Sequence, residues 1–262
     1  MTAVPGEAQG FRSNDMSQLI AAPELASAVE SLYAAFQAYP LRSTTNPCSC
    51  CHSPNDEHRL HKKPLRRLTA DDLYQYSMDA LLVWGDPDDF RHFLPRIFEL
   101  VVSSDDYVFV DREIVLQKLY HAEWHTWPES ERNAVRQFLL ALWRAVLQIP
   151  PGDDPYGADE LESWLCAIAQ SEADLSAYLD EWLQSSASVA NWNLAAAITR
   201  AGLSSETGGH ANAFWQGHND QLRHISEWLR SEAVRKKLEA AIEIFVKEPF
   251  AEELYSALLM LG

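Results

Sequence analysis

Residues 86–101 read DPDDFRHFLPRIFELV, and this stretch decides the fold class. Its apolar side chains recur at steps of three and four, which is the spacing of one face of an α-helix. They are Phe90, Phe93, Leu94, Ile97, Phe98 and Val101. Asp86 followed by Pro87 is a typical helix start, because a proline at the first helical position lacks only an N–H that would be unpaired anyway. Pro95 lies inside the pattern, so we expect a kink near Arg91.

The same periodicity extends outward in both directions. Helical patterns cover residues 23–39, 68–84, 111–124, 126–148, 157–170, 173–184, 187–201, 211–230, 232–247 and 250–261. Thr69 with Asp72, and Thr126 with Glu129, have the spacing of capping boxes. Alternating β-branched runs are nearly absent, the best being residues 107–110. We therefore expect an all-α fold with more than about 60% helix, well above the usual third.

The second half of the chain contains an internal repeat. Residues 179–185 read LDEWLQS, and residues 225–231, which lie 46 positions later, read ISEWLRS. This period suits helical-hairpin repeats of the HEAT or armadillo type. We expect antiparallel helical hairpins in a HEAT-like α-solenoid, with 179–201 and 225–246 superposing; the alternative is an irregular α-bundle.

Three parts of the chain follow from these patterns. Residues 1–15 are polar and contain Pro5, Gly6 and Gly10, so we expect a flexible tail. Residues 16–149 form an N-terminal helical half, in which 41–67 is expected to be a long Cys/His loop. The break at 149–152, Ile-Pro-Pro-Gly, separates it from a C-terminal helical-repeat half at 150–262.

The Cys/His loop contains the clearest candidate for chemistry. Cys48 and Cys51 form a C-x-x-C knuckle, whose two thiolates can reach one tetrahedral ion. The remaining ligands would come from His52, His58 and His61. Sulfur and imidazole ligands favour zinc, and we expect the ion to be structural, stapling a loop that has little else to fold it. The alternatives are reduced surface cysteines or a redox pair.

Charge is unevenly distributed along this acidic chain, whose net charge is −17. Such a balance argues against nucleic-acid binding, which depends on basic groups. Residues 145–199 contain nine acidic residues and no Lys or Arg to offset them. We expect this stretch to attract a basic protein partner, or else to be a solvated helix surface. The predicted contact residues are Asp153, Asp154, Asp159, Glu160 and Glu162.

Other signals are weaker. No stretch approaches 18 apolar residues and the amino terminus does not read as a signal peptide, so we expect a cytoplasmic protein with no membrane partner. His121 and His125 are spaced to share one helix face, like half of a zinc site, but Glu123 would fall near the opposite face.

Part of the chain resembles a known group of sequences. The resemblance rests on the Cys segment, the stretch 64–68 (PLRRL), Trp84-Gly85-Asp86, and the stretch 89–96 (DFRHFLPR). These are similar to an uncharacterised family of bacterial proteins, over about the middle 100 residues. The resemblance implies family membership and no known activity.

From the residues themselves we expect a non-enzymatic scaffold or adaptor with an acidic binding face, such as an immunity-type protein that neutralises a basic partner. The competing hypothesis is a metal-dependent enzyme that uses the Cys/His loop, or His121 and His125, as its metal site.

Overall fold

The computed structural model describes residue 19 and residues 21–103, 110–152, 160–200 and 212–262. Helices account for 70% of these residues, and no strand occurs among them. The predicted all-α fold is therefore confirmed. Within the described ranges the nearest approach to a sheet is one isolated bridge between Ala80 and Trp84.

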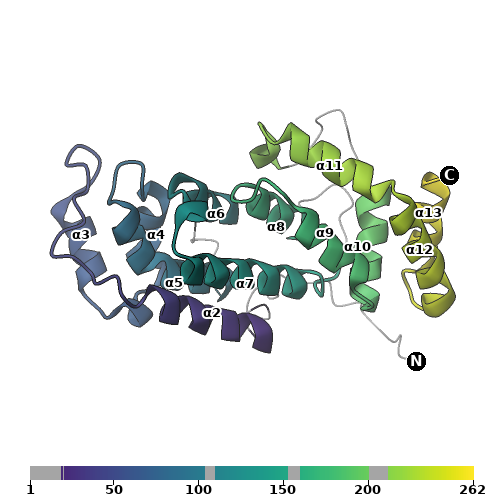
Figure 1. Cartoon of the computed structure of the whole chain (residues 1–262), viewed down its shortest axis with the longest axis horizontal. Coiled ribbons are helices and arrows are strands. Elements are labelled where there is room, and N and C mark those ends of the chain that lie inside the picture. Colours follow the sequence, from purple (N-terminus) through teal and green to yellow (C-terminus); the bar gives the residue numbers. More distant parts are fainter. Residues whose placement is uncertain (1–18, 20, 104–109, 153–159, 201–211) are drawn as a thin grey trace, which may run out of the picture.

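The helices, with the labels of Figure 1, follow one another along the chain. They are α2 (Pro23–Phe36), α3 (Pro54–His61), η1 (Leu65–Arg67), α4 (Ala70–Asp79), α5 (Pro87–Ser103), α6 (Arg112–His121), η2 (Trp124–Thr126), α7 (Glu129–Val146), α8 (Glu160–Ala169), α9 (Ser176–Gln184), α10 (Ser188–Thr199), η3 (Ala213–Trp215), α11 (Asn219–Leu229), α12 (Glu232–Phe245) and α13 (Ala251–Met260).

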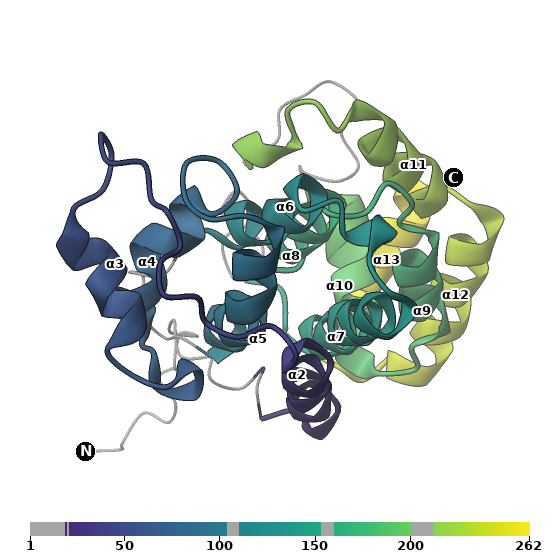
Figure 2. The same ribbon diagram turned by 60° about the vertical axis from the view of Figure 1, so that its left-hand side comes forward.

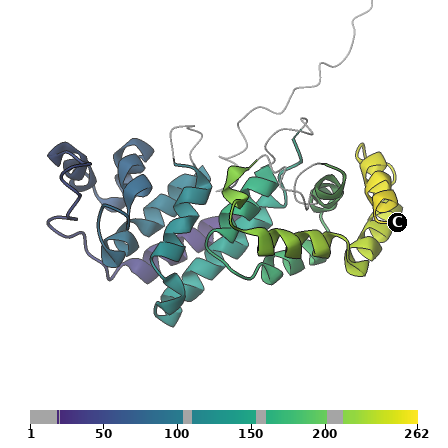
Figure 3. The same cartoon turned by 90° about the horizontal axis from the view of Figure 1, so that it is seen from above.

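The helices form an elongated body (Figures 1 and 3). Helices α3 and α4 lie at one end, and α12 and α13 lie at the other. In the middle, α2 packs along α7 and α5, and α6 packs against α8 (Figure 2). Near the far end, α13 packs against both α10 and α12. No described helix is long and apolar enough to cross a membrane.

A HEAT-like repeat is not confirmed. Each repeat of a solenoid contacts only its neighbours, whereas α2 packs along α7, much later in the chain. Among the described helices, neither α9 with α10 nor α11 with α12 forms one of the extensively packed pairs. The superposition of these two segments stays a prediction, and the packing favours the irregular-bundle alternative.

Buried tryptophans organise the core. Trp143 and Trp182 meet edge to face, with ring centroids 5.7 Å apart, and both are fully buried. Each indole N–H reaches a backbone carbonyl, Trp143 bonding to Tyr178 at 2.8 Å and Trp182 to Ala190 at 2.9 Å. A buried indole needs such an acceptor, so these bonds fix α7 on α9 and α9 on α10.

Two predicted helix starts are confirmed. Thr69 and Asp72 form the capping box of α4. Asp86 Oδ1 accepts hydrogen bonds from the backbone N–H groups of Asp88 and Asp89 at the start of α5. These signals are purely local, because the cap side chain and the backbone N–H that donates to it lie within one turn of each other. Helix α5 continues through Pro95 to Ser103 as one element.

Several predicted boundaries are wrong. Helix α4 ends at Asp79 rather than near Trp84, and the chain then turns through Leu81, whose φ is 67°. Helix α6 ends at His121, and Glu123 has φ 50°, so His121 and His125 do not share a helix face. The predicted Thr126 cap is also absent, since its hydroxyl bonds back to the Glu123 carbonyl at 2.8 Å.

The segment 41–67 is not the structureless loop that we expected. It contains α3 and η1. Ser53 and Asp56 form a capping box at the start of α3, and Pro54 occupies the first helical position. The proline that suggested a loop instead begins a helix, because at the first helical position its missing N–H would be unpaired anyway and its ring meets no preceding helical turn.

Candidate metal centre

Three cysteine side chains gather on one tight turn. The Sγ atom of Cys48 lies 2.6 Å from that of Cys50, which lies 3.5 Å from that of Cys51. All three sulfurs lie within 4.8 Å of one another. The backbone N–H groups of Cys51 and His52 both donate to the Cys48 carbonyl at 3.0 Å, which curls the chain and turns the side chains together.

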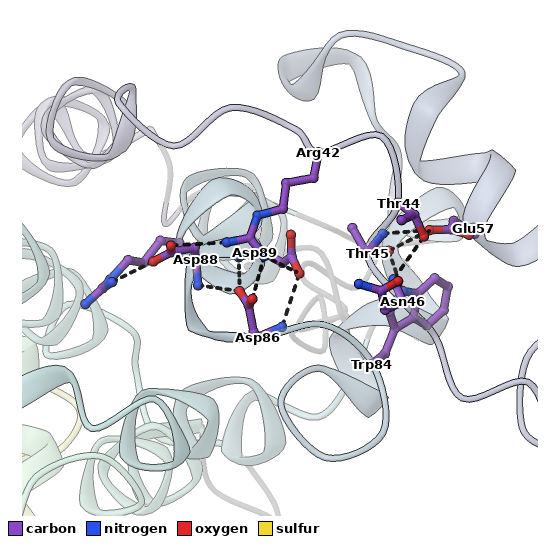
Figure 4. A network of polar contacts seen from close by, with 10 residues as sticks. Arg42, Thr44, Thr45, Asn46, Glu57, Trp84, Asp86, Asp88 and Asp89 are labelled. Carbon is purple, nitrogen blue, oxygen red and sulfur yellow. Dashed lines mark hydrogen bonds and ion pairs between the residues drawn. The ribbon is translucent and has the colours of Figure 1, made fainter.

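A buried threonine fixes the chain just before this turn (Figure 4). Glu57, on α3, accepts hydrogen bonds from Thr44 Oγ1 and from the Thr45 backbone N–H, both at 2.6 Å. On the other side, Trp84 Nε1 donates to Thr45 Oγ1 at 2.7 Å, and both residues are buried. The approach to the cysteine turn is thus clamped between α3 and the turn at 80–84.

A second polar cluster holds the chain further back (Figure 4). The Arg42 guanidinium lies 2.5 Å from Asp86, 3.1 Å from Asp88 and 3.7 Å from Asp89, in each case from an Oδ2 atom. Burial raises the pKa of Asp89. For Asp86, burial also acts upward, but the hydrogen bond from Arg42 and two backbone N–H groups keeps its pKa below its ordinary value.

The cysteine turn is tied directly to the turn at 80–84. The backbone N–H of Cys48 donates to the Val83 carbonyl at 2.9 Å. Beside it, Leu82 and Val83 are exposed apolar side chains, with 59% and 40% of their surface accessible. The cysteine turn is therefore bonded to a turn that carries an exposed apolar patch, consisting of Leu82 and Val83, at the α3–α4 end of the molecule.

The three thiols influence one another electrostatically. Hydrogen bonds from the side chain and backbone of Cys50, and then from Cys51, lower the pKa of Cys48. Interaction with Cys48 and Cys51 raises the pKa of Cys50 to about 11. Cys48 therefore has the lower pKa of the two, and the neighbouring sulfurs oppose ionisation of Cys50. A bound cation would remove this repulsion and stabilise all three thiolates together.

One of the two measured sulfur spacings is close to what zinc requires, and the other is shorter. A zinc–sulfur bond of about 2.3 Å in a tetrahedral shell places neighbouring sulfurs about 3.8 Å apart. The Cys50–Cys51 distance of 3.5 Å nearly matches this edge. The Cys48–Cys50 pair, at 2.6 Å, would have to open by about 1.2 Å to reach it.

Of the ligands predicted from sequence, the structure brings the two cysteines together but not the histidines. Cys48 and Cys51 come together as expected, and Cys50, which the C-x-x-C interpretation left out, joins them. Among the described residues, no histidine belongs to this group. His58 and His61 are exposed on α3. The C-x-C spacing of Cys48 and Cys50 was the available signal for the third cysteine.

His52 is buried against the turn at 80–84. Its ring centroid lies 4.4 Å from that of Trp84, and its Nε2 lies 3.6 Å from Asp79 Oδ2. Its side chain is 1% exposed, and neither ring nitrogen has a hydrogen-bond partner among the described residues. His52 thus anchors the end of the cysteine turn by packing on Trp84, and its role as a ligand stays a prediction.

A small polar cavity of about 130 Å³ lies between α3 and α4. Its charged lining residues are already engaged within the protein. Arg59 pairs with Asp71 at 3.2 Å, and Asp56 accepts from the Ser53 backbone N–H at 2.8 Å. We therefore locate the chemistry at the sulfurs and not in this cavity.

The described part of the predicted acidic face is not free. Glu160 forms two hydrogen bonds with Arg112, at 2.5 and 3.2 Å, and Glu162 is buried. Within the same stretch, Glu181 is paired with Arg144 at 2.6 Å. The stretch has no Lys or Arg of its own, but Arg112 on α6 and Arg144 on α7 offset Glu160 and Glu181 from outside it. Asp153, Asp154 and Asp159 lie outside the described residues.

Comparison with known proteins adds no relative. No family model, curated protein or solved structure matches this chain. The resemblance noted from the sequence motifs stays a prediction. The functional argument therefore rests on the geometry of the cysteine turn and its surroundings.

Proposed function

We propose that this chain is a non-enzymatic interaction protein that binds one zinc ion through Cys48, Cys50 and Cys51 and contacts a partner at that end. The observation that supports it is the gathering of three sulfurs on one turn. Thiolates select soft or borderline ions such as zinc and copper(I), and zinc accepts tetrahedral thiolate shells without redox chemistry.

The role proposed for the ion differs from the expected staple. Glu57, Thr45 and Trp84 already clamp the segment through protein hydrogen bonds, and the capping box starts α3. The ion is therefore not required to hold the chain before and after the turn. Its proposed effect is confined to the turn 48–51 and to what that turn contacts.

The surroundings of the sulfurs favour an interaction site over a catalytic one. Three thiolates leave one position of a tetrahedral zinc shell for an outside ligand. Catalytic metals normally lie in a concave pocket, whereas Cys50 and Cys51 are exposed. The adjacent apolar patch, Leu82 and Val83, suits contact with another protein. We propose that a partner covers this patch and supplies the remaining ligand.

Zinc titration of reduced protein against a chromogenic chelator tests the ligand set. The wild-type chain should bind one equivalent. Cys48→Ser, Cys50→Ser and Cys51→Ser should each weaken binding at least about tenfold, or about 1.4 kcal/mol. Cys166→Ala is the matched control, because Cys166 is buried in α8. The proposal fails if the wild type binds no zinc, or if the three serine variants bind as tightly as the control.

His52→Ala separates this ligand set from the one predicted from sequence. If the three cysteines are the only protein ligands of the ion, His52→Ala should change the zinc affinity little. A loss as large as that of the cysteine variants would make His52 the fourth ligand. Cobalt-substituted protein then reports on the open position, because added imidazole should alter its visible spectrum only if an outside ligand can bind.

A further inference from the structure

The three sulfurs are not equivalent. Cys48 and Cys50 are 2.6 Å apart, whereas Cys50 and Cys51 are 3.5 Å apart. A shared zinc ion would hold each pair at about 3.8 Å. The first pair is therefore closer than a common metal would keep it, and its sulfurs face each other directly.

The backbone permits a bond within this pair and disfavours one between the neighbouring cysteines. Cys50 and Cys51 are joined by a trans peptide, so their Cα atoms are about 3.8 Å apart, below the usual disulfide range of about 4.4–6.8 Å. Ser49 separates Cys48 from Cys50, so two steps of about 3.8 Å join their Cα atoms, and a bent path over two such steps allows a spacing within the disulfide range.

Access from solvent also differs among the four cysteines. Cys50 is exposed and Cys48 is partly exposed, while Cys166 is buried. The clamp of Glu57, Thr45 and Trp84 keeps the chain before the pair in place. A small oxidant can therefore reach Cys50 with Cys48 already beside it.

We infer that Cys48 and Cys50 form a hydroperoxide-reactive dithiol, which closes to a disulfide and opens the zinc site. This deepens the proposed function, because oxidation and metal binding would use the same sulfurs. With only the Cys51 thiolate left, the oxidised turn cannot hold the ion. The chain would then lose its metal, and the contact that depends on it, when peroxide rises.

The reaction balances with one peroxide per disulfide. The thiolate of one cysteine of the pair attacks one peroxide oxygen, the O–O bond breaks, and the departing hydroxide takes up a proton to become water. The thiolate of the other cysteine then attacks the sulfenic sulfur so formed, which makes the Cys48–Cys50 S–S bond and expels the second oxygen as water after protonation. Two thiols lose two electrons, which hydrogen peroxide gains.

Metal-free reduced protein tests the dithiol on its own. One equivalent of hydrogen peroxide should remove two thiols per chain and lower the intact mass by two hydrogen atoms. Cys51→Ser should behave like the wild type, whereas Cys48→Ser and Cys50→Ser should lose thiols at least about tenfold more slowly. The Cys166→Ala control should not differ from the wild type. The inference is overturned if Cys51→Ser abolishes the disulfide, or if Cys50→Ser forms it at the wild-type rate.

Zinc-loaded protein tests the link to the metal. Peroxide should release the ion into a chromogenic chelator in step with the loss of two thiols, and a reductant should restore binding. Retention of zinc after the disulfide has formed would overturn the link. If the protein binds no zinc but forms the disulfide, the proposed function fails and the reactive dithiol stands. If it binds zinc but forms no disulfide, the zinc site stands and the reactive dithiol fails.

Discussion

Replacing Glu57 with alanine should release the cysteine turn without unfolding the helices around it. One carboxylate oxygen of Glu57 accepts from Thr44 Oγ1 at 2.6 Å, from the Thr45 N–H at 2.6 Å and from Thr45 Oγ1 at 3.3 Å. A hydrogen bond to a charged group contributes about 1.5–3 kcal/mol. We assign the bond to the buried Thr45 N–H a contribution near the upper end of that range. The bond to the exposed Thr44 and the long third bond contribute little. We therefore expect a local loss of about 3 kcal/mol.

Amide hydrogen exchange measures this loss residue by residue. A decrease of about 3 kcal/mol in the free energy of opening speeds exchange about a hundredfold. The amides of Thr45 and Cys48, which donate to Glu57 and Val83, should show this acceleration. Amides in the middle of α7 should not change, because α7 packs on α2 and not on the cysteine turn.

Glu253→Ala is a matched control at the other end of the molecule. Glu253 also accepts three hydrogen bonds, from Trp192 Nε1, Thr199 Oγ1 and Arg200 Nε. Its removal should speed exchange in α10 and α13 and leave the Thr45 and Cys48 amides protected. Wild-type exchange rates at Thr45 and Cys48 in the Glu57→Ala protein would refute the clamp.

Three further predictions concern stability and metal binding. Burial raises the pKa of Glu172 to about 7, so between its ordinary value of 4.5 and about 7 the folded protein holds a proton that the unfolded chain has lost. Stability should therefore fall by about 3 kcal/mol as pH rises through this window, and Glu172→Gln should flatten the dependence in urea unfolding; an unchanged slope would contradict the assignment. Trp84→Phe removes the donor to Thr45 and the larger ring beneath His52, and should lower the free energy of unfolding by about 2 kcal/mol, whereas an unshifted urea midpoint would argue against the clamp. Zinc should leave wild-type protein as pH falls, because protonated thiols cannot coordinate, and a chelator assay that shows pH-independent retention would exclude thiolate ligands.

The parts of the fold that were predictable from sequence are those set within one helical turn. Thr69 with Asp72, and Asp86 with Pro87, identify their helix starts because the cap and the N–H that donates to it are near neighbours in the chain. The start of α3 carried the same kind of signal in Ser53 and Asp56, but the prolines around it favoured a loop. The period of the apolar residues predicted the all-α class correctly.

The predictions from sequence were wrong where contacts between residues far apart in the chain determine the structure. Helix α4 ends at Asp79, and the turn that follows places Trp84 where it bonds Thr45, a contact that spans 39 positions. The acidic stretch looked unbalanced because Arg112 and Arg144 precede it and reach it only in the folded protein. At the candidate site, local spacing brought Cys48 and Cys51 together correctly. The inclusion of Cys50 and the packing of His52 on Trp84 depend on how the turn is held.

X-ray absorption at the zinc edge tests the central claim most directly, because it counts the atoms bound to the ion in the intact reduced protein. We predict three sulfurs at about 2.3 Å and one lighter nitrogen or oxygen atom. In the Cys50→Ser protein the sulfur count should fall to two. A wild-type shell with two or fewer sulfurs, or a count that Cys50→Ser leaves unchanged, would contradict a zinc site made by Cys48, Cys50 and Cys51.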